Sequence, residues 1–254
     1  MSVRQLLDLT GKTALVTGGS RGLGLQIAEA LGEMGAALAI TARKKDELDR
    51  AVAHLGKAKS FVCDIGKREA IAPAAEAVLQ EFGKVDILVN NAGATWGAPA
   101  AEHPLEAWDK LVNVNLSGAF ALTQIIARRS MIPAKWGRII NVASIAGLLG
   151  QDPRFAPTAA YTATKHGLVG LTRQLAAEWG VHGITVNAIC PGFFPSKMTQ
   201  ATLESTGALI KEWTPTRRLG GGEDLKGLAV LLASEASRHI SGQAIAVDGG
   251  ASIV

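Results

Sequence analysis

The chain has 254 residues, of which 48% are apolar and 19% charged, as expected for one large globular domain. The net charge of +4 is spread over scattered basic pairs, and Cys63 and Cys190 match no metal-ligand spacing, which argues against a nucleic-acid partner and a metal site. No apolar run reaches signal-peptide length or the ~20 residues of a membrane span, so we expect a cytoplasmic protein without a membrane partner.

A glycine-rich turn follows the first predicted strand, residues 12–17. Glycines stand at positions 18, 19, 22 and 24, and the residues from Gly22 onward have the apolar recurrence of an amphipathic helix. A turn between a strand and a helix presents backbone N–H groups and the positive end of the helix dipole, which suits a pyrophosphate. The spacing differs from the G-x-G-x-x-G fingerprint, and a purely structural loop is the alternative.

The second predicted strand, residues 35–42, ends in a basic cluster. In an NAD site an acidic residue near this strand end holds the ribose 2′-hydroxyl. Here Arg43 and two lysines follow instead, and Arg21 lies within the glycine-rich turn. These cations suit a ribose 2′-phosphate. The alternative is that they only begin a solvated helix, predicted over residues 46–55.

The next two predicted strands also end in polar residues. The third, residues 60–65, ends near Asp64, which could accept from an adenine amino group or cap the helix predicted over 67–82. The fourth, residues 84–93, ends in Asn90-Asn91-Ala92-Gly93. A polar, glycine-terminated turn is expected beside a cofactor at the carboxyl edge of a parallel sheet.

Asn115 lies inside a helix predicted over residues 105–130. Asparagine is a poor residue for a helix interior, so its presence there needs a reason. A buried polar contact and a catalytic role both fit the sequence.

The fifth predicted strand, residues 137–144, delivers the Ser144 hydroxyl at its carboxyl end. A helix predicted over 161–179 begins with Tyr161, the only tyrosine of the chain, and carries Lys165 four residues later. Residues i and i+4 share a helix face, and a neighbouring ammonium lowers the pKa of a phenol. Such a pair can exchange protons with an alcohol or a ketone. The alternative is a half-buried ring beside a solvated amine.

The remaining elements complete an alternating pattern. A strand over 184–190 ends in Pro191-Gly192, and a helix over 223–233 and a strand over 243–248 finish the chain. Strands that alternate with helices throughout predict an α/β fold, a single-domain, doubly wound parallel sheet of about seven strands over residues 1–254.

Two irregular segments, residues 151–160 and 193–219, are expected to close a substrate pocket as mobile pieces. Aromatic residues such as Phe155 would form an apolar wall, whereas Arg154 or Lys197 would bind a carboxylate. The alternative is that these charges face solvent, because Lys and Arg are mostly exposed.

The sequence resembles the short-chain dehydrogenase/reductase family over essentially its whole length. The resemblance implies a Rossmann-type fold and a nicotinamide cofactor. It rests on motifs that occur in the family's order: Thr17-Gly18-x-x-x-Gly22-x-Gly24, Asn90-Asn91-Ala92-Gly93, Asn115, Ser144, Tyr161-x-x-x-Lys165 and Pro191-Gly192.

The resemblance also implies a catalytic tetrad and a set of cofactor contacts. Tyr161 would be the general acid/base, Lys165 would lower its pKa and hold the ribose, Ser144 would bind the substrate oxygen, and Asn115 would anchor a relay water. The residues expected to bind NADP(H) are Gly18, Ser20, Arg21, Gly22, Leu23, Gly24, Arg43, Asp64, Ile65, Asn91, Ala92, Gly93, Tyr161, Lys165, Pro191, Gly192, Phe194 and Ser196.

We therefore expect an NADP(H)-dependent oxidoreductase that interconverts a secondary alcohol and a ketone. Residues 187–199 resemble those of bacterial gluconate 5-dehydrogenases and 3-oxoacyl-acyl-carrier-protein reductases, which makes keto-sugar acids and 3-oxoacyl thioesters the candidate substrates. By resemblance we expect a homotetramer, paired through the helices over 105–130 and 161–179, whose apolar residues include Leu168, Val169, Leu171, Leu175 and Trp179. A non-catalytic nucleotide-binding scaffold on the same fold is the alternative.

Overall fold

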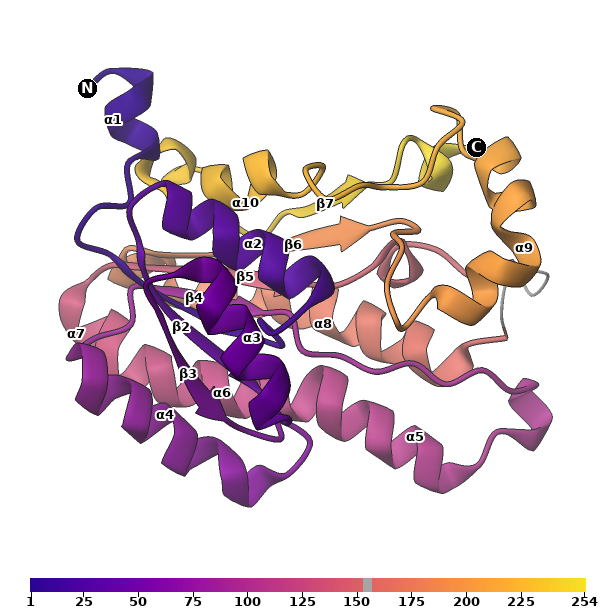
Figure 1. Cartoon of the computed structure of the whole chain (residues 1–254), viewed down its shortest axis with the longest axis horizontal. Helices are drawn as coiled ribbons and strands as arrows, with labels where there is room; N and C mark the ends of the chain where they lie inside the picture. The colour runs from indigo at the N-terminus through magenta and orange to yellow at the C-terminus, as the bar shows by residue number, and fades with distance from the viewer. Residues whose placement is uncertain (153–156) are drawn as a thin grey trace.

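A computed structural model of the chain describes residues 1–152 and 157–254. The described residues form a seven-stranded sheet, parallel throughout, in the order β3-β2-β1-β4-β5-β6-β7 (Figure 1). The chain builds outward from β1 to β3 and then returns to the other side of β1, which creates a switch point between β1 and β4. The predicted doubly wound sheet is confirmed. Its strands are β1 (Thr13–Thr17), β2 (Ala37–Ala42), β3 (Ala58–Val62), β4 (Ile87–Asn90), β5 (Gly137–Val142), β6 (Ile184–Pro191) and β7 (Ala244–Val247).

Helices cover both faces of this sheet. On one face α2 packs against α3 and α10, and on the other α4 packs against α6 while α8 packs on β6 and α5 (Figure 1). The α-helices are α1 (Val3–Leu7), α2 (Gly22–Glu33), α3 (Lys45–Leu55), α4 (Arg68–Phe82), α5 (Leu105–Val112), α6 (Gly118–Ile126), α7 (Ile132–Ala134), α8 (Ala159–Trp179), α9 (Gln200–Trp213) and α10 (Lys226–Ala233).

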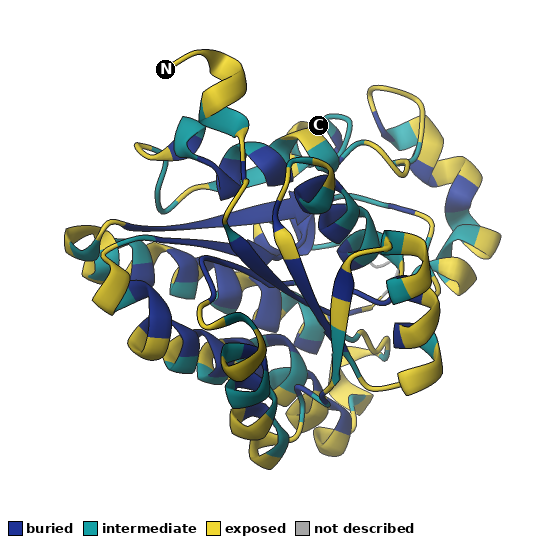
Figure 2. Ribbon diagram, turned by 60° about the vertical axis from the view of Figure 1, so that its left-hand side comes forward, coloured by how far each residue is buried: buried dark blue, intermediate teal, exposed yellow. Residues whose placement is uncertain are grey.

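Alternate residues of the central strands supply two apolar clusters, one on each face of the sheet. Val16 and Val89 belong to the cluster that contains Leu31 of α2. Their neighbours Leu15 and Leu88 belong to the cluster on the opposite face. Figure 2 shows the strands dark blue between helices that are yellow on their outer sides. Each fully buried aliphatic side chain contributes about 1.5–3 kcal/mol, so this core holds the strand ends in place.

Helix α8 directs most of its apolar residues into this core. Leu168, Val169 and Leu175 are only 1%, 3% and 4% exposed within the single chain. The chain's own sheet and helices cover these three side chains, which therefore belong to the core, and the predicted pairing of this helix in a homotetramer stays a prediction. Leu171 and Trp179 are only partly buried.

The prediction that residues 193–219 are irregular is wrong, because this segment contains the 14-residue helix α9. Its two prolines, Pro195 and Pro215, flank the helix and do not interrupt it. Only Gly207 and Ile210 are buried in it, so its apolar face is narrow and gives a weak periodic signal.

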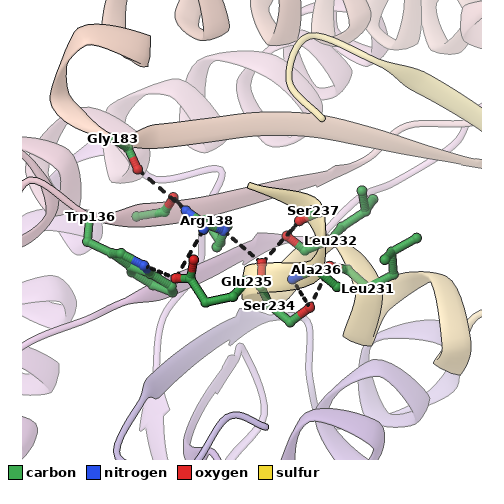
Figure 3. A network of polar contacts seen from close by, with 10 residues as sticks. Trp136, Arg138, Gly183, Leu231, Leu232, Ser234, Glu235, Ala236 and Ser237 are labelled. Carbon is green, nitrogen blue, oxygen red and sulfur yellow. Dashed lines mark hydrogen bonds and ion pairs between the residues drawn. The ribbon is translucent and has the colours of Figure 1, made fainter. Parts of the chain in front are cut away.

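At the amino edge of the sheet, Arg138 of β5 is buried within a polar network (Figure 3). Its guanidinium donates to the backbone oxygens of Ser234, Gly137 and Gly183 at 3.1, 2.9 and 3.4 Å. It also lies 3.3 Å from a Glu235 carboxylate oxygen and 4.4 Å from the centroid of the Trp136 ring. The network fastens β5 to the turn that follows α10.

Candidate active site

Ser144, Tyr161 and Lys165 meet beyond the carboxyl end of β5. Ser144 begins a 3-10 turn over Ile145–Gly147 that lies directly against α8. A Cβ at Gly147 would be 2.7 Å from the backbone oxygen of Lys165, so only glycine allows this approach. The contact brings the strand end that carries Ser144 onto the helix that carries the other two residues.

The Tyr161 phenol is half-buried, and burial raises its pKa above the usual 10.0. A hydrogen bond with the Ser144 side chain acts in the opposite direction but does not cancel the effect of burial. The sequence predicted a lowered pKa, and this direction is wrong in the structure. The reason is that desolvation of the phenolate outweighs the stabilising interactions. The phenol is consequently protonated at neutral pH.

Lys165 is 4% exposed, and burial lowers its pKa to about 8. Its Nζ donates to the backbone oxygen of Val142 at 2.8 Å and lies 5.6 Å from the centroid of the Tyr161 ring. A Cβ at Gly93 would be 3.7 Å from the same nitrogen, so the amine faces the turn after β4. The alternative prediction was a half-buried Tyr161 ring beside a solvated amine, and it is wrong for Lys165 because this amine is buried.

Asn115 lies in a π-helical turn, Asn113–Ser117, between α5 and α6. It is 1% exposed, and its side chain makes three hydrogen bonds. The amide nitrogen donates to the backbone oxygen of Ala94 and to the Thr164 hydroxyl, both at 3.0 Å, and its oxygen accepts from the Ala94 N–H at 2.8 Å. The predicted buried polar contact is confirmed. It ties the turn after β4 to α8, whereas the predicted catalytic role stays a prediction.

The glycine-rich turn is held against the end of β4. Asn91 Nδ2 donates to the backbone oxygens of Thr17 and Gly18 at 2.9 and 3.2 Å. The Thr17 hydroxyl oxygen accepts from the N–H groups of Asn91 and Ala92 at 3.0 and 3.1 Å. A Cβ at Gly24 would lie 2.3 Å from Asn91 Nδ2. Asn91 and Ala92 thus build the turn, and a direct cofactor contact by either remains a prediction.

The start of α2 has the properties of an anion site. Its N-cap residue, Arg21, makes no side-chain cap hydrogen bond, and no acidic residue lies in the first turn. Gly22 has φ +54°, which favours glycine, and a Cβ there would meet open space. Uncapped N–H groups behind an open glycine fit the pyrophosphate of a dinucleotide. Ser20 is buried and Leu23 is partly buried beside this opening.

Arg43 and Asp64 line a cavity of about 410 Å³ together with Val114. The Asp64 carboxylate accepts from the Gly66 N–H at 3.1 Å, while Lys67 is the N-cap of α4. Asp64 therefore shapes the turn before α4, and the alternative that it caps the helix is wrong. Ile65 is buried beside this turn. This cavity, which Arg43 lines, is the candidate place for the adenosine, and the predicted contacts of Arg43, Asp64 and Ile65 stay predictions.

The turn after β6 is fixed by neighbours from the end of the chain. A Cβ at Gly192 would lie 2.8 Å from Cβ of Asp248. Phe194 is 4% exposed, and its ring packs on Gly220. The Ser196 hydroxyl lies 3.0 Å from the Thr199 hydroxyl. These contacts order the segment beside Pro191, and the predicted contacts of these residues with a carboxamide stay predictions.

The segment before α8 is joined to the turn after β4. Ala98 and Thr158 form an isolated parallel bridge, and the Thr158 hydroxyl donates to the Gln151 side-chain oxygen at 3.0 Å. Arg154 and Phe155, which were predicted to contact the substrate, lie outside the described residues. Lys197 is exposed.

Comparison with known proteins identifies the family. A family model described as short chain dehydrogenase matches residues 12–207. The chain belongs to the short-chain dehydrogenase family. The predicted family is confirmed, and the chain is an oxidoreductase.

Three proteins similar to this short-chain dehydrogenase come from bacteria. Gluconate 5-dehydrogenase of Gluconobacter oxydans (strain 621H) is 39% identical over 100% of this chain and 99% of its own. The 3-oxoacyl-(acyl-carrier-protein) reductase of Escherichia coli (strain K12) is 36% identical over 96% and 98%. The crystal structure of a gluconate 5-dehydrogenase from Burkholderia cenocepacia J2315, in complex with NADP and tartrate, is 34% identical, has a TM-score of 0.93 and covers 100% of both chains.

Within the described residues of this short-chain dehydrogenase, no group of His, Cys, Asp or Glu side chains could hold a metal ion. None of the described helices has the length and apolar character needed to cross a membrane.

Sequence reasoning missed two residues of the site. Thr17 was visible in the motif but was not assigned a role, although its hydroxyl orders the turn after β4. Glu47 of α3 gave no sequence signal, and the structure places its carboxylate 2.9 Å from Arg21. Glu47 follows Arg43 by four residues in the sequence, but only the fold brings its carboxylate to the glycine-rich turn.

Proposed function

We propose that this protein is a cytoplasmic, NADP(H)-dependent oxidoreductase that interconverts a secondary alcohol and a ketone of a sugar acid such as 5-ketogluconate. The observation that carries the proposal is the convergence of Tyr161, Ser144 and Lys165 beside the open glycine-rich turn. A protonated phenol, a hydroxyl and a buried amine at one point suit proton transfer to a carbonyl oxygen.

The residues divide the reduction between them. NADPH, when bound, supplies a hydride to the carbonyl carbon. The Ser144 hydroxyl orients the carbonyl oxygen, and Tyr161 donates its proton to that oxygen as the alcohol forms. Lys165, with a pKa of about 8, is charged at neutral pH and stabilises the resulting phenolate. Asn115 keeps the turn at Ala94 in place for the ribose side of the site.

The preference for NADP(H) is supported by the residues around the adenosine cavity. Arg43 lines the cavity, and Arg21 begins α2 beside the glycine-rich turn. Guanidinium groups make charge-assisted hydrogen bonds with phosphate oxygens. The gluconate 5-dehydrogenase structure that holds NADP has the same fold over the full length.

A sugar acid is proposed first because two of the three relatives above are gluconate 5-dehydrogenases. A 3-oxoacyl thioester is the second candidate, supported by large apolar side chains on the loops after β4, β5 and β6. Trp96, Leu148 and Met198 are 47%, 37% and 42% exposed there. An acyl chain would cover them.

The decisive experiment follows the loss of NADPH absorbance with 5-ketogluconate and with acetoacetyl-coenzyme A in parallel. The expected result is a higher kcat/KM for the sugar acid. A higher kcat/KM for the thioester would overturn the substrate assignment. NADPH binding without turnover of any ketone would support the non-catalytic scaffold instead.

The proposed assembly is a homotetramer. Its support in this chain is an apolar cavity of about 440 Å³ between α6 and α8, lined by Leu116, Phe120, Gly167 and Leu171. Small residues on α8 beside the 40% exposed Phe120 would allow a second copy of the helix pair to approach. Sedimentation velocity at micromolar protein tests this, and a monomer would contradict it.

A further inference from the structure

Glu47 of α3 lies between two of the cations that face the proposed 2′-phosphate. One of its carboxylate oxygens, Oε1, is 2.9 Å from Arg21 Nη1 and 3.7 Å from Lys44 Nζ. The Glu47 side chain is 16% exposed, whereas those of Arg21 and Lys44 are 49% and 59% exposed. The carboxylate is therefore the most buried member of this charged cluster.

The cluster stands where the glycine-rich turn meets the end of β2. The Gly19 N–H donates to the backbone oxygen of Thr41 at 3.2 Å, which joins the two segments. Arg43 follows two residues later and lines the adenosine cavity. Arg21, Arg43, Lys44 and Glu47 thus form a charged cluster at the strand end where the 2′-phosphate is proposed to lie, and the adjoining cavity is lined by further charges of both signs, among them Asp64 and Lys67.

We propose that Glu47 limits how strongly this site prefers a cofactor that carries a 2′-phosphate. The inference rests on the proposed NADP(H) site. The carboxylate reduces the charge of Arg21, Arg43 and Lys44 from three net positive charges to two. A phosphate monoester carries about −1.5 to −2 charge at neutral pH, so the carboxylate opposes its binding but hardly affects a ribose hydroxyl.

Two effects of Glu47 oppose each other. Its hydrogen bond holds Arg21 near the turn, but an exposed ion pair of this kind contributes little. Its repulsion would act on a nearly doubly charged phosphate held by the same cations, and is the larger effect. Glu47→Gln separates the two, because glutamine retains an acceptor oxygen for Arg21 while the charge is lost.

The test measures binding by calorimetry, using adenosine 2′,5′-bisphosphate and adenosine 5′-monophosphate, which differ only in the 2′-phosphate. We expect Glu47→Gln to bind the bisphosphate about three- to tenfold more tightly than wild type, and the monophosphate within about twofold. The gain should shrink as salt is added. The matched control is Asp49→Asn, which removes one charge from the same helix, where Asp49 pairs with Lys45 at 2.8 Å.

Unchanged or weaker binding of the bisphosphate by Glu47→Gln overturns the inference, as does an equal gain in Asp49→Asn. Wild-type protein that binds neither nucleotide overturns it together with the proposed cofactor site. Because binding is measured without turnover, a failure to reduce ketones counts against the proposed reaction alone.

Discussion

Arg138 and Lys165 are buried to nearly the same extent, at 2% and 4% exposed, but they lie at opposite edges of the sheet. Arg138 has three backbone acceptors, a carboxylate and an aromatic ring around its guanidinium (Figure 3). For Lys165 the described residues provide one hydrogen-bond acceptor, the backbone oxygen of Val142. An ammonium has three donors, so Lys165 retains two for a ligand, whereas four acceptors already surround the five donors of Arg138.

The number of hydrogen-bond partners, more than burial, distinguishes the structural cation Arg138 from Lys165, the proposed catalytic one. Burial lowers the pKa of both groups, and the Glu235 carboxylate opposes that shift for Arg138. Among the described residues no carboxylate compensates the desolvation of the Lys165 ammonium. Buried charges whose desolvation is not compensated are typical of functional sites.

The largest effect on kcat is expected when the phenolic hydroxyl of Tyr161, one helical turn from Lys165, is removed. Tyr161→Phe should lower kcat by at least ~10²–10⁴-fold, because general acid catalysis contributes about that much. Nucleotide affinity and the urea unfolding midpoint should stay close to wild type, since the ring remains. Near-normal kcat with the best ketone would show that another group supplies the proton.

The structural cation should instead affect stability. Arg138→Met removes the cation that pairs with Glu235 and donates to three backbone oxygens, and should lower the unfolding free energy by roughly 3 kcal/mol. This is the lower end of the range of about 3–5 kcal/mol for breaking a buried ion pair, because the Glu235 side chain is 35% exposed. Urea unfolding measures the change, while kcat per folded molecule should be unaltered. A loss below ~1 kcal/mol would contradict the assigned role.

Lys165→Met should raise the unfolding free energy measured with urea, whereas Arg138→Met should lower it. The folded pKa of about 8 lies below the ordinary 10.5, so protonation disfavours the native state. That cost is full below pH 8 and disappears as pH rises to 10.5, where both states are neutral. The variant should therefore be more stable than wild type by about 1–3 kcal/mol at pH 7, and the difference should vanish above pH 10.5. A difference that does not change with pH would contradict this explanation.

The smallest effect on stability is expected for an exposed ion pair, Arg218 and Asp224. Asp224 accepts two hydrogen bonds from Arg218 and one from the Gly221 N–H, and its pKa is lowered to about 2. Solvent screening limits the contribution to below ~1 kcal/mol. Because the folded pKa is depressed below 3.8, this contribution is present above pH 3.8 and is lost as pH falls toward 2. Asp224→Asn should remove the effect in acid titration of unfolding, and a loss above ~2 kcal/mol would show that screening was overestimated.

The sequence by itself determined the order of strands and helices and most of the candidate site. The strands ending at Thr17, Asn90 and Val142 were predictable because their apolar runs and the turns after them are local signals. The glycine-rich turn and the pair Tyr161 and Lys165 were predictable for the same reason, since their spacing is set within one element.

The tertiary structure alone decided how these pieces act on one another. The direction in which the Tyr161 pKa shifts depends on desolvation by surrounding atoms, which the spacing of residues in the sequence does not reveal. Helix α9 escaped prediction because its buried face holds only Gly207 and Ile210. Glu47 and Arg138 acquire their roles from partners 26 and 97 residues away in the sequence. Charges interact through space, so these contacts exist only once the chain has folded.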